Sequence, residues 1–195
     1  MNAAAKAKKR SSVWILGIFL LVIAAPMIAA SFMINHGQSK IHYNNQGNLI
    51  SGHKNITHIT LHNISQDTPL PGKDLLGKWW LVYVGPQICQ ETCYDILYNM
   101  RQIRTALGKD ASRLERLYIA DNLNENYPEI KQVRINAQDF DHLFGSISDK
   151  DNRDMVGELY IIDPKGNIMM QYDVDMPPKA ILSDLKRLLK VSKIG

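Results

Sequence analysis

The sequence predicts an α/β domain that follows one N-terminal apolar helix. Three observations lead to this prediction. An uncharged segment lies near the start of the chain, short continuous apolar runs recur after it, and amphipathic helical patterns follow several of these runs. The chain has 195 residues, and the roughly 150 that follow the apolar segment suit one domain with a single core.

The N-terminal segment is predicted to anchor the chain in a membrane. Residues 1–12 carry four cations and no acid, and residues 13–33 contain no charged residue. A helix of that length can cross a hydrocarbon layer about 30 Å thick. The basic end is expected in the cytoplasm and the rest of the chain outside it. A cleaved signal peptide is the alternative because residues 29–31 are small, although the apolar stretch of a signal peptide is usually only about 7–15 residues long.

The charge balance gives no reason to expect a nucleic-acid partner. The chain has 23 Lys and Arg against 19 Asp and Glu, and removing the four N-terminal cations leaves 19 against 19. The alkaline isoelectric point therefore reflects membrane topology, since the exported part is electroneutral. Residues 34–48 are polar and are expected to form a tether. Residues 49–195 are expected to form the folded domain.

Apolar runs predict the strands of this domain. Residues 49–63 alternate loosely and are expected to form a short hairpin or edge strands, which the prolines and glycine of residues 69–72 interrupt. Residues 79–84 are continuously apolar, as in a strand buried on both faces, and Gly85 and Pro86 end the run. Further strands are predicted at residues 117–120 and 159–162, with 168–172 as the hairpin partner of the latter across a tight turn.

Helical periodicity predicts the elements between these strands. From Thr92 one face is apolar, and Gly108 follows as a helix-ending residue. Residues 121–137 are polar and without clear pattern, residues 140–144 suggest a short helix that ends at Gly145, and Pro178 opens a final amphipathic helix. The order strand, cysteine loop, helix, strand, helix, hairpin, helix is that of a thioredoxin-like fold, with a glutaredoxin-type core and an N-terminal β extension.

The candidate functional residues are Cys89 and Cys93, the two cysteines of the chain, at the junction of the first buried strand and the helix after it. Side chains at i and i+4 share a helix face, so both sulfurs can approach one ion or each other. Free backbone N–H groups at the start of a helix stabilise a thiolate, which is both a metal ligand and a nucleophile. The spacing alone leaves metal binding and electron exchange open. A structural disulfide is the third possibility, although so short a loop would constrain the unfolded chain little.

The residues around the cysteines resemble the Sco/SenC family. The resemblance is carried by the run Gly-Lys-Trp-Trp-Leu-Val-Tyr-Val-Gly of residues 77–85, the Cys-x-x-x-Cys spacing, and Tyr-Ile-Ile-Asp-Pro-Lys-Gly-Asn at residues 160–167. It extends from about residue 45 to residue 189. It implies a membrane-anchored, extracytoplasmic, thioredoxin-fold copper chaperone for cytochrome c oxidase. The implied partner is the copper-site subunit of the oxidase or another copper or thiol assembly factor.

The chain departs from the family pattern at the third copper ligand, which in the family is a histidine. Counted back from Pro164, the position of that histidine falls on Met155. The prolines that follow each cysteine in the family are replaced by Gln90 and Tyr94. A thioether is a soft ligand that suits Cu(I), so the resemblance implies a Cu(I) site made by Cys89, Cys93 and Met155. Alternatively, Met155 only fills core space.

Three functions remain open from the sequence. The first is Cu(I) binding and transfer through the thiol pair. The second is a thiol–disulfide oxidoreductase, in which Cys89 and Cys93 reduce the cysteines of a copper-site partner. Thioredoxin-type reductases usually carry Cys-x-x-Cys and a proline before the third strand, where this chain has Val-Gly-Glu at residues 156–158. The third is an assembly scaffold that has lost both activities.

Overall fold

The computed structural model describes residues 14–28, 31, 45–52, 54–86, 88–120, 122, 127, 129–145, 147 and 157–194. The chain divides into two compact units, Met1–Asn44 and Asn45–Gly195. In the first, residues 14–28 form a helix. Within the described ranges, no helix is long and apolar enough to cross a membrane. The expected membrane-spanning helix over residues 13–33 is therefore not supported there, and residues 13, 29, 30, 32 and 33 lie outside the described part.

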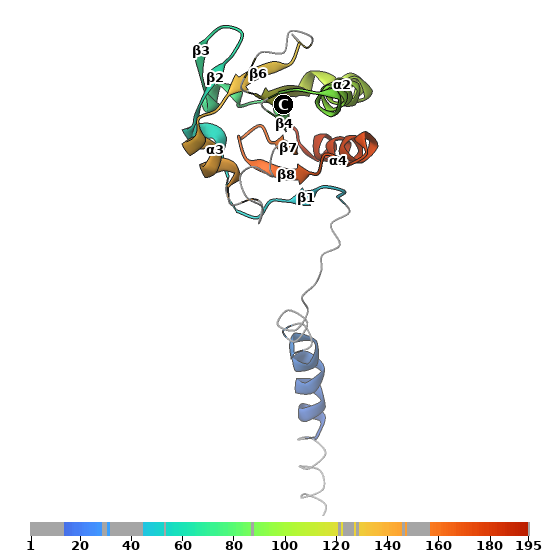
Figure 1. The fold of residues 1–195 in the computed structure, drawn as a ribbon. Helices are drawn as coiled ribbons and strands as arrows, with labels where there is room; N and C mark the ends of the chain where they lie inside the picture. Colours follow the sequence, from blue (N-terminus) through green and yellow to red (C-terminus); the bar gives the residue numbers. More distant parts are fainter. Residues whose placement is uncertain are drawn as a thin grey trace, which may run out of the picture. The chain divides into compact units, whose positions relative to one another are not determined.

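The second unit is built on a mixed β-sheet (Figure 1). Its described strands lie in the order β1-β8-β7-β4-β5-β6-β2-β3. Strands β4, β5 and β6 run parallel, whereas β7 is antiparallel to both β4 and β8. The strand bounds are β1 Asn48–Leu49, β2 Thr60–Asn63, β3 Thr68–Pro71, β4 Trp79–Val84, β5 Leu114–Ile119, β6 Lys131–Arg134, β7 Leu159–Ile162 and β8 Ile168–Tyr172.

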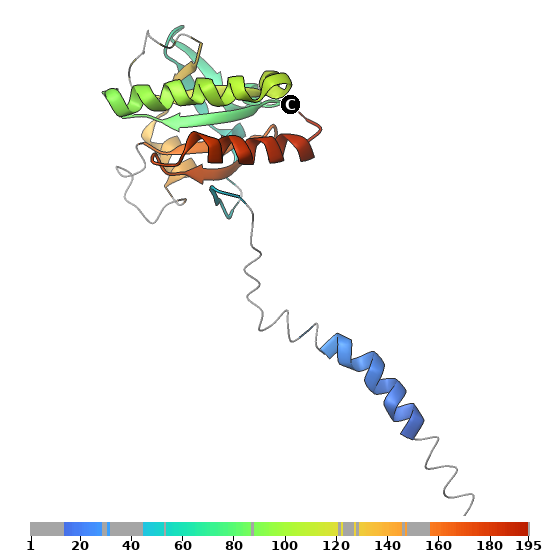
Figure 2. The same ribbon diagram turned by 90° about the vertical axis from the view of Figure 1, so that its right-hand side faces the viewer.

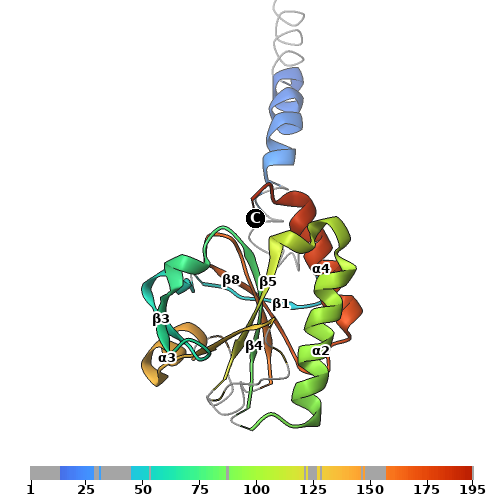
Figure 3. The same cartoon turned by 90° about the horizontal axis from the view of Figure 1, so that it is seen from above.

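Helices cover both faces of this sheet. The described α-helices are α2 Glu91–Ala106, α3 Ala137–Phe144 and α4 Pro178–Val191, with short 3-10 helices η1 Ile56–His58, η2 Gly72–Leu75 and η3 Gly108–Arg113. Helices α2 and α4 lie side by side on one face (Figure 2), and α3 lies on the other (Figure 3). The path β4–α2–β5 followed by β7–β8–α4 is a thioredoxin-like core, so the predicted fold class is confirmed for this unit.

The central strand β4 is buried along its whole length, as predicted. Trp79, Leu81 and Tyr83 face the core under α2 and α4, whereas Trp80, Val82 and Val84 face the core under α3. Side chains alternate across a strand, so only a continuous apolar run can fill two cores at once. Helix α2 buries the predicted stripe, and Gly108 follows it with a φ of 60°. The left-handed conformation explains why glycine stands at this helix end.

Two strands of the sheet were not predicted. Strand β3 contains Pro69 and Pro71, which from the sequence pattern predict a break and not a strand. Because β3 is the last strand of the sheet, it can accommodate residues that lack an N–H. The observed hairpin is therefore β2–β3 and not a hairpin within residues 49–63. Strand β6 lies within the polar stretch 121–137, and only its central Gln132 and Val133 are buried.

Strand β5 begins three residues before its predicted start. The apolar pattern does not reach that far because two charged residues interrupt it. One of them, Arg116, is buried, and its Nη1 lies 3.8 Å from the Glu129 carboxylate. Burial lowers the pKa of Arg116, and the proximity of Glu129 opposes that shift. A buried arginine is tolerated when a carboxylate compensates its charge, and this pairing was not visible in the local pattern.

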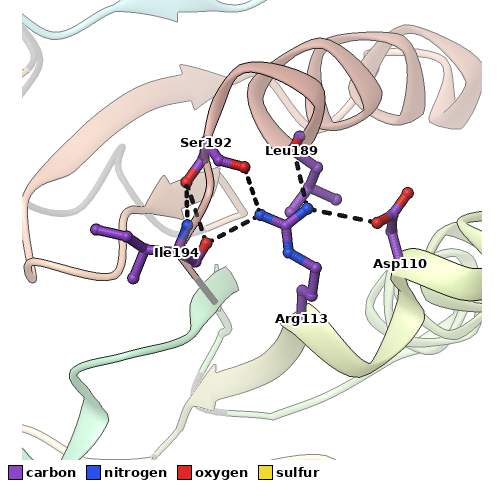
Figure 4. A network of polar contacts seen from close by, with 5 residues as sticks. All are labelled: Asp110, Arg113, Leu189, Ser192 and Ile194. Carbon is purple, nitrogen blue, oxygen red and sulfur yellow. Dashed lines mark hydrogen bonds and ion pairs between the residues drawn. The ribbon is translucent and has the colours of Figure 1, made fainter.

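An arginine ties the end of α4 to the start of β5 (Figure 4). Arg113 donates from Nη1 to the Leu189 carbonyl at 2.9 Å, and from Nη2 to the carbonyls of Ser192 at 2.8 Å and Ile194 at 3.0 Å. Its Nη1 also lies 3.4 Å from the Asp110 carboxylate. The last carbonyls of a helix lack partners within the helix, so Arg113 satisfies the Leu189 carbonyl of α4 and two carbonyls of the residues that follow the helix.

Candidate functional site

The cysteine loop lies at the carboxyl ends of the parallel strands β4 and β5. Backbone bonds hold the end of β4 from both sides: the Gly85 amide donates to the Ile119 carbonyl at 2.9 Å, and the Gly157 amide donates to the Val84 carbonyl at 2.8 Å. Residues 85–90 then lead into α2, which begins at Glu91. Sites in α/β sheets form where parallel strands end, because the loops that follow them meet there.

Cys89 and Cys93 form a disulfide, with their Cα atoms 5.3 Å apart. Cys89 lies in the loop and Cys93 in the first turn of α2, as predicted. The two sulfurs differ in access, because Cys93 is only 2% exposed whereas Cys89 is partly exposed. Next to Cys89, the Ile88 side chain is 74% exposed. The pair therefore converges as expected, and it presents one sulfur to solvent.

The buried sulfur lies against a tyrosine from the neighbouring strand. The Tyr118 hydroxyl is 3.5 Å from Cys93 Sγ, and both groups are buried. The Tyr118 ring stacks on Tyr83, with centroids 5.5 Å apart and an interplanar angle of 11°. Burial raises the pKa of Tyr83 to about 12, and the neighbouring Tyr118 adds to this shift. Tyr83 therefore stays protonated at neutral pH, and it packs against the Tyr118 ring whose hydroxyl contacts the buried sulfur.

Aromatic side chains also lie near the start of α2. Tyr94 stacks on Tyr127 with centroids 6.4 Å apart, and the Tyr127 hydroxyl donates to the Tyr94 carbonyl at 3.2 Å. Tyr98, one turn further along α2, is 53% exposed. Partial burial raises the pKa of Tyr127, and the nearby Glu129 carboxylate raises it further. Ile88, Tyr94 and Tyr98 therefore give the loop and the start of α2 exposed apolar and aromatic surface.

A buried carboxylate lies beside the same strand end. The Val84 amide donates to the Glu158 carbonyl at 3.1 Å, and the Glu158 side chain accepts hydrogen bonds from Tyr160 at 2.6 Å and Gln171 at 2.7 Å. Burial raises the pKa of Tyr160, and its hydrogen bond to Glu158 raises it further. Tyr160 packs in the core under α3, across the sheet from the disulfide. The network therefore supports the strand end, and its tyrosine lies in a different core cluster from Cys93.

The predicted third ligand, Met155, lies outside the described residues. Gly157, two positions later, is described, and it bonds to Val84 where β4 leads into the cysteine loop. Among the described residues, no group of three or more His, Cys, Asp or Glu could hold a metal ion. The structure thus brings Cys89 and Cys93 together, and the part of Met155 in the site stays a prediction.

The sequence pattern predicts only a strand around Tyr83 and gives no functional signal for Tyr118. The pattern within each strand gives no signal for their pairing. The two tyrosines are direct partners in the parallel ladder of β4 and β5. Only the observed register, with Val84 beside Ile119, places Tyr83 and Tyr118 side by side beneath the loop. The missing step was the register between strands, which a pattern within one strand does not contain.

A family model described as "Transmembrane-like, thioredoxin-like, C-terminal domain" matches residues 79–192, which run from the start of β4 to just past α4. Yeast Sco1 with copper bound is structurally similar at 18% identity, over 75% of this chain and 93% of that chain, with a TM-score of 0.56. A SCO1/SenC family lipoprotein from Bacillus anthracis matches at 20% identity, over 69% and 95% of the two chains, with a TM-score of 0.52. No curated protein matches.

A third similar structure is BsSco, described with a disulfide switch as a member of the Sco family of cytochrome c oxidase assembly proteins. It matches at 14% identity, over 72% of this chain and 96% of that chain, with a TM-score of 0.53. These similarities confirm the Sco/SenC resemblance at the level of the fold, at low sequence identity. Because the family model covers more than half of the residues, the chain belongs to the family of transmembrane-like, thioredoxin-like C-terminal domains.

Proposed function

We propose that this protein is a Sco-like factor that supports copper insertion into cytochrome c oxidase, and that it binds and transfers Cu(I) through Cys89 and Cys93. The observation that carries the proposal is the convergence of both sulfurs at the open end of the sheet, on a fold shared with the Sco proteins. Yeast Sco1, one of those proteins, was crystallised with copper bound. The copper ion is here a cargo and not a resident cofactor.

The chemistry of the pair suits this cargo. Once the bridge is reduced, two thiolates one helical turn apart can bind one soft ion, and Cu(I) prefers sulfur ligands. The start of α2 favours the charged form of Cys93 through its free N–H groups. Met155 would add a neutral thioether as the third ligand. Its sequence position supports this, two residues before the Gly157 amide that bonds to β4.

A Cu(I) competition titration on the reduced full chain tests the proposal. We expect about one Cu(I) retained against a chelator by the wild type, none by Cys89→Ser, and a lower affinity for Met155→Ala. Met169→Ala is a matched control, because Met169 is a partly buried methionine on β8, near the end of that strand furthest from the cysteine loop. If Met155→Ala and Met169→Ala both bind as the wild type does, Met155 is not a ligand. If the wild type retains no Cu(I), the carrier function is wrong.

A second function, thiol–disulfide exchange with a copper-site partner, is favoured by one observation. The cysteines form a bridge with one accessible and one buried sulfur, which is the arrangement that lets a partner attack a single side. In that case Cys93→Ser should trap a mixed disulfide between Cys89 and the partner, the copper-site subunit of the oxidase or another assembly factor. The wild type would then bind no Cu(I) tightly.

We also propose that the domain works outside the cytoplasm, held at the membrane by the N-terminal apolar segment. The four cations before this segment and its lack of charge support this orientation. A disulfide between two nearby cysteines persists most readily in such an oxidising compartment. Protease digestion of intact and of permeabilised cells tests the topology, and cleavage of the domain only after the cytoplasmic side is opened would refute it.

A further inference from the structure

We propose that Tyr118 is a positioning residue of the cysteine pair: its hydroxyl donates a hydrogen bond to Cys93 Sγ and stabilises the negative charge that this sulfur acquires when the bridge opens. The inference rests on the proposed function in so far as the bridge must open before the pair can bind Cu(I) or exchange electrons. In the oxidised chain Cys93 carries no proton, so the phenol is the donor in the 3.5 Å contact.

The position of this hydroxyl is held by the tertiary structure. Tyr118 is 2% exposed, it stacks on Tyr83, and the pairing of β4 with β5 fixes its height under the loop. Gly85 leaves the space that the ring needs, because a Cβ at this position would overlap the Tyr118 ring. A buried hydroxyl held on both sides loses little further freedom when it bonds to the sulfur.

The opening step puts charge on the sulfur that Tyr118 contacts. A thiolate of a dithiol partner attacks Cys89 Sγ, the accessible sulfur. A bond forms between the partner sulfur and Cys89, the Cys89–Cys93 bond breaks, and its electron pair leaves on Cys93 Sγ as a thiolate. The second partner thiolate then attacks the partner's own bridged sulfur and releases the Cys89 thiolate. The partner dithiol is oxidised to a disulfide, and the chain gains two electrons as a dithiol.

A hydrogen bond to a charged acceptor is about twice as strong as one to a neutral acceptor, so the contact stabilises the opened state more than the bridge. Removing the hydroxyl should lower the equilibrium constant for reduction by about fivefold. For a two-electron couple this corresponds to a potential about 20 mV more negative. The opening rate should fall by about two- to fivefold, because part of the charge has developed on the leaving sulfur in the transition state.

The test compares Tyr118→Phe with Tyr83→Phe in the metal-free full chain. Both variants keep an aromatic ring and remove one buried hydroxyl, but only Tyr118 contacts the sulfur. Opening by dithiothreitol is followed by alkylation and mass measurement, and the equilibrium with a dithiothreitol buffer gives the potential. We expect slower opening and a more negative potential in Tyr118→Phe, and values within about twofold of the wild type in Tyr83→Phe.

Wild-type behaviour of Tyr118→Phe, or an equal effect of both variants, overturns the proposal. Near-ultraviolet circular dichroism of the oxidised variants shows that the native packing is kept. The result is separable from the proposed function. If the wild type binds no Cu(I) and Cys93→Ser traps no partner, while Tyr118→Phe still slows opening, the proposed function is wrong and the role of Tyr118 stands. If the wild type binds Cu(I) and Tyr118→Phe opens normally, only the role of Tyr118 is lost.

Discussion

Replacing Asp184 by Asn is expected to destabilise the unit of residues 45–195 by about 2–3 kcal/mol. Asp184 lies on α4 and is 2% exposed. Its Oδ2 accepts hydrogen bonds from the Gln46 amide at 2.8 Å, the Gly47 amide at 3.0 Å and the Tyr172 hydroxyl at 3.1 Å. This carboxylate therefore fastens the first residues of the domain to its last helix and to β8.

The magnitude follows from the change in the acceptor. A hydrogen bond to a charged group contributes about 1.5–3 kcal/mol and one to a neutral group about 0.5–1.5, so each of the three bonds loses roughly 1 kcal/mol in Asp184→Asn. The ion pair with Arg187 adds little, since its atoms are 3.8 Å apart and Arg187 is half exposed. For a domain of this size, 1 kcal/mol corresponds to about 2–4 °C, so Tm should fall by about 5–10 °C.

Urea and thermal unfolding measure the loss, and hydrogen exchange shows whether the Gln46 and Gly47 amides lose protection. Tyr172→Phe is the matched control, because it removes one of the three donors and should cost only about 1 kcal/mol. Arg187→Gln should change stability by less than about 0.5 kcal/mol. If Asp184→Asn costs no more than Tyr172→Phe and both amides stay protected, the carboxylate does not hold this segment and the reasoning fails.

Three further predictions concern the site, the buried phenols and the end of α4. Gly85→Ala should slow disulfide opening as Tyr118→Phe does, because the added Cβ overlaps the Tyr118 ring. It should also lower the free energy of unfolding by about 1–3 kcal/mol. Wild-type opening kinetics in this variant would contradict the prediction. Burial raises the pKa of Tyr83, to about 12, and also the pKa values of Tyr160 and Tyr172. The free energy of unfolding should therefore be unaffected by these groups below about pH 10 and fall above it by about 1.4 kcal/mol per pH unit for each tyrosine. Urea unfolding from pH 9 to 11 measures this slope, which Tyr83→Phe should reduce by about a third, and a flat profile refutes the prediction. Arg113→Met should lower the free energy of unfolding by about 2 kcal/mol, because it removes the donors to the Leu189 carbonyl of α4 and to the Ser192 carbonyl just after it. Arg101→Met, at a 62% exposed side chain, should lower it by less than about 0.5 kcal/mol, and equal losses in thermal unfolding would show that the carbonyl bonds contribute nothing specific.

Much of the thioredoxin-like core could be predicted because its signals are local. The apolar run of β4, the hairpin β7–β8 and the stripes of α2 and α4 were all confirmed. The failures have a common physical cause, since each depended on a neighbour distant in sequence. Prolines are compatible with β3 only because that strand lies at the sheet edge, and β5 accepts the buried Arg116 only because Glu129 lies beside it.

The site divides in the same way. The sequence by itself determined that two sulfurs one helical turn apart stand where β4 gives way to α2, because strand, loop, helix and Cys-x-x-x-Cys spacing lie within one short segment. Only the tertiary structure decided that Cys93 is buried while Cys89 is accessible, and that the Tyr118 hydroxyl reaches the buried sulfur. Tyr118 is 25 residues from Cys93 in the sequence. The parallel register of β4 and β5 brings them together, and that register is set by the packing of two strands and a helix around one core.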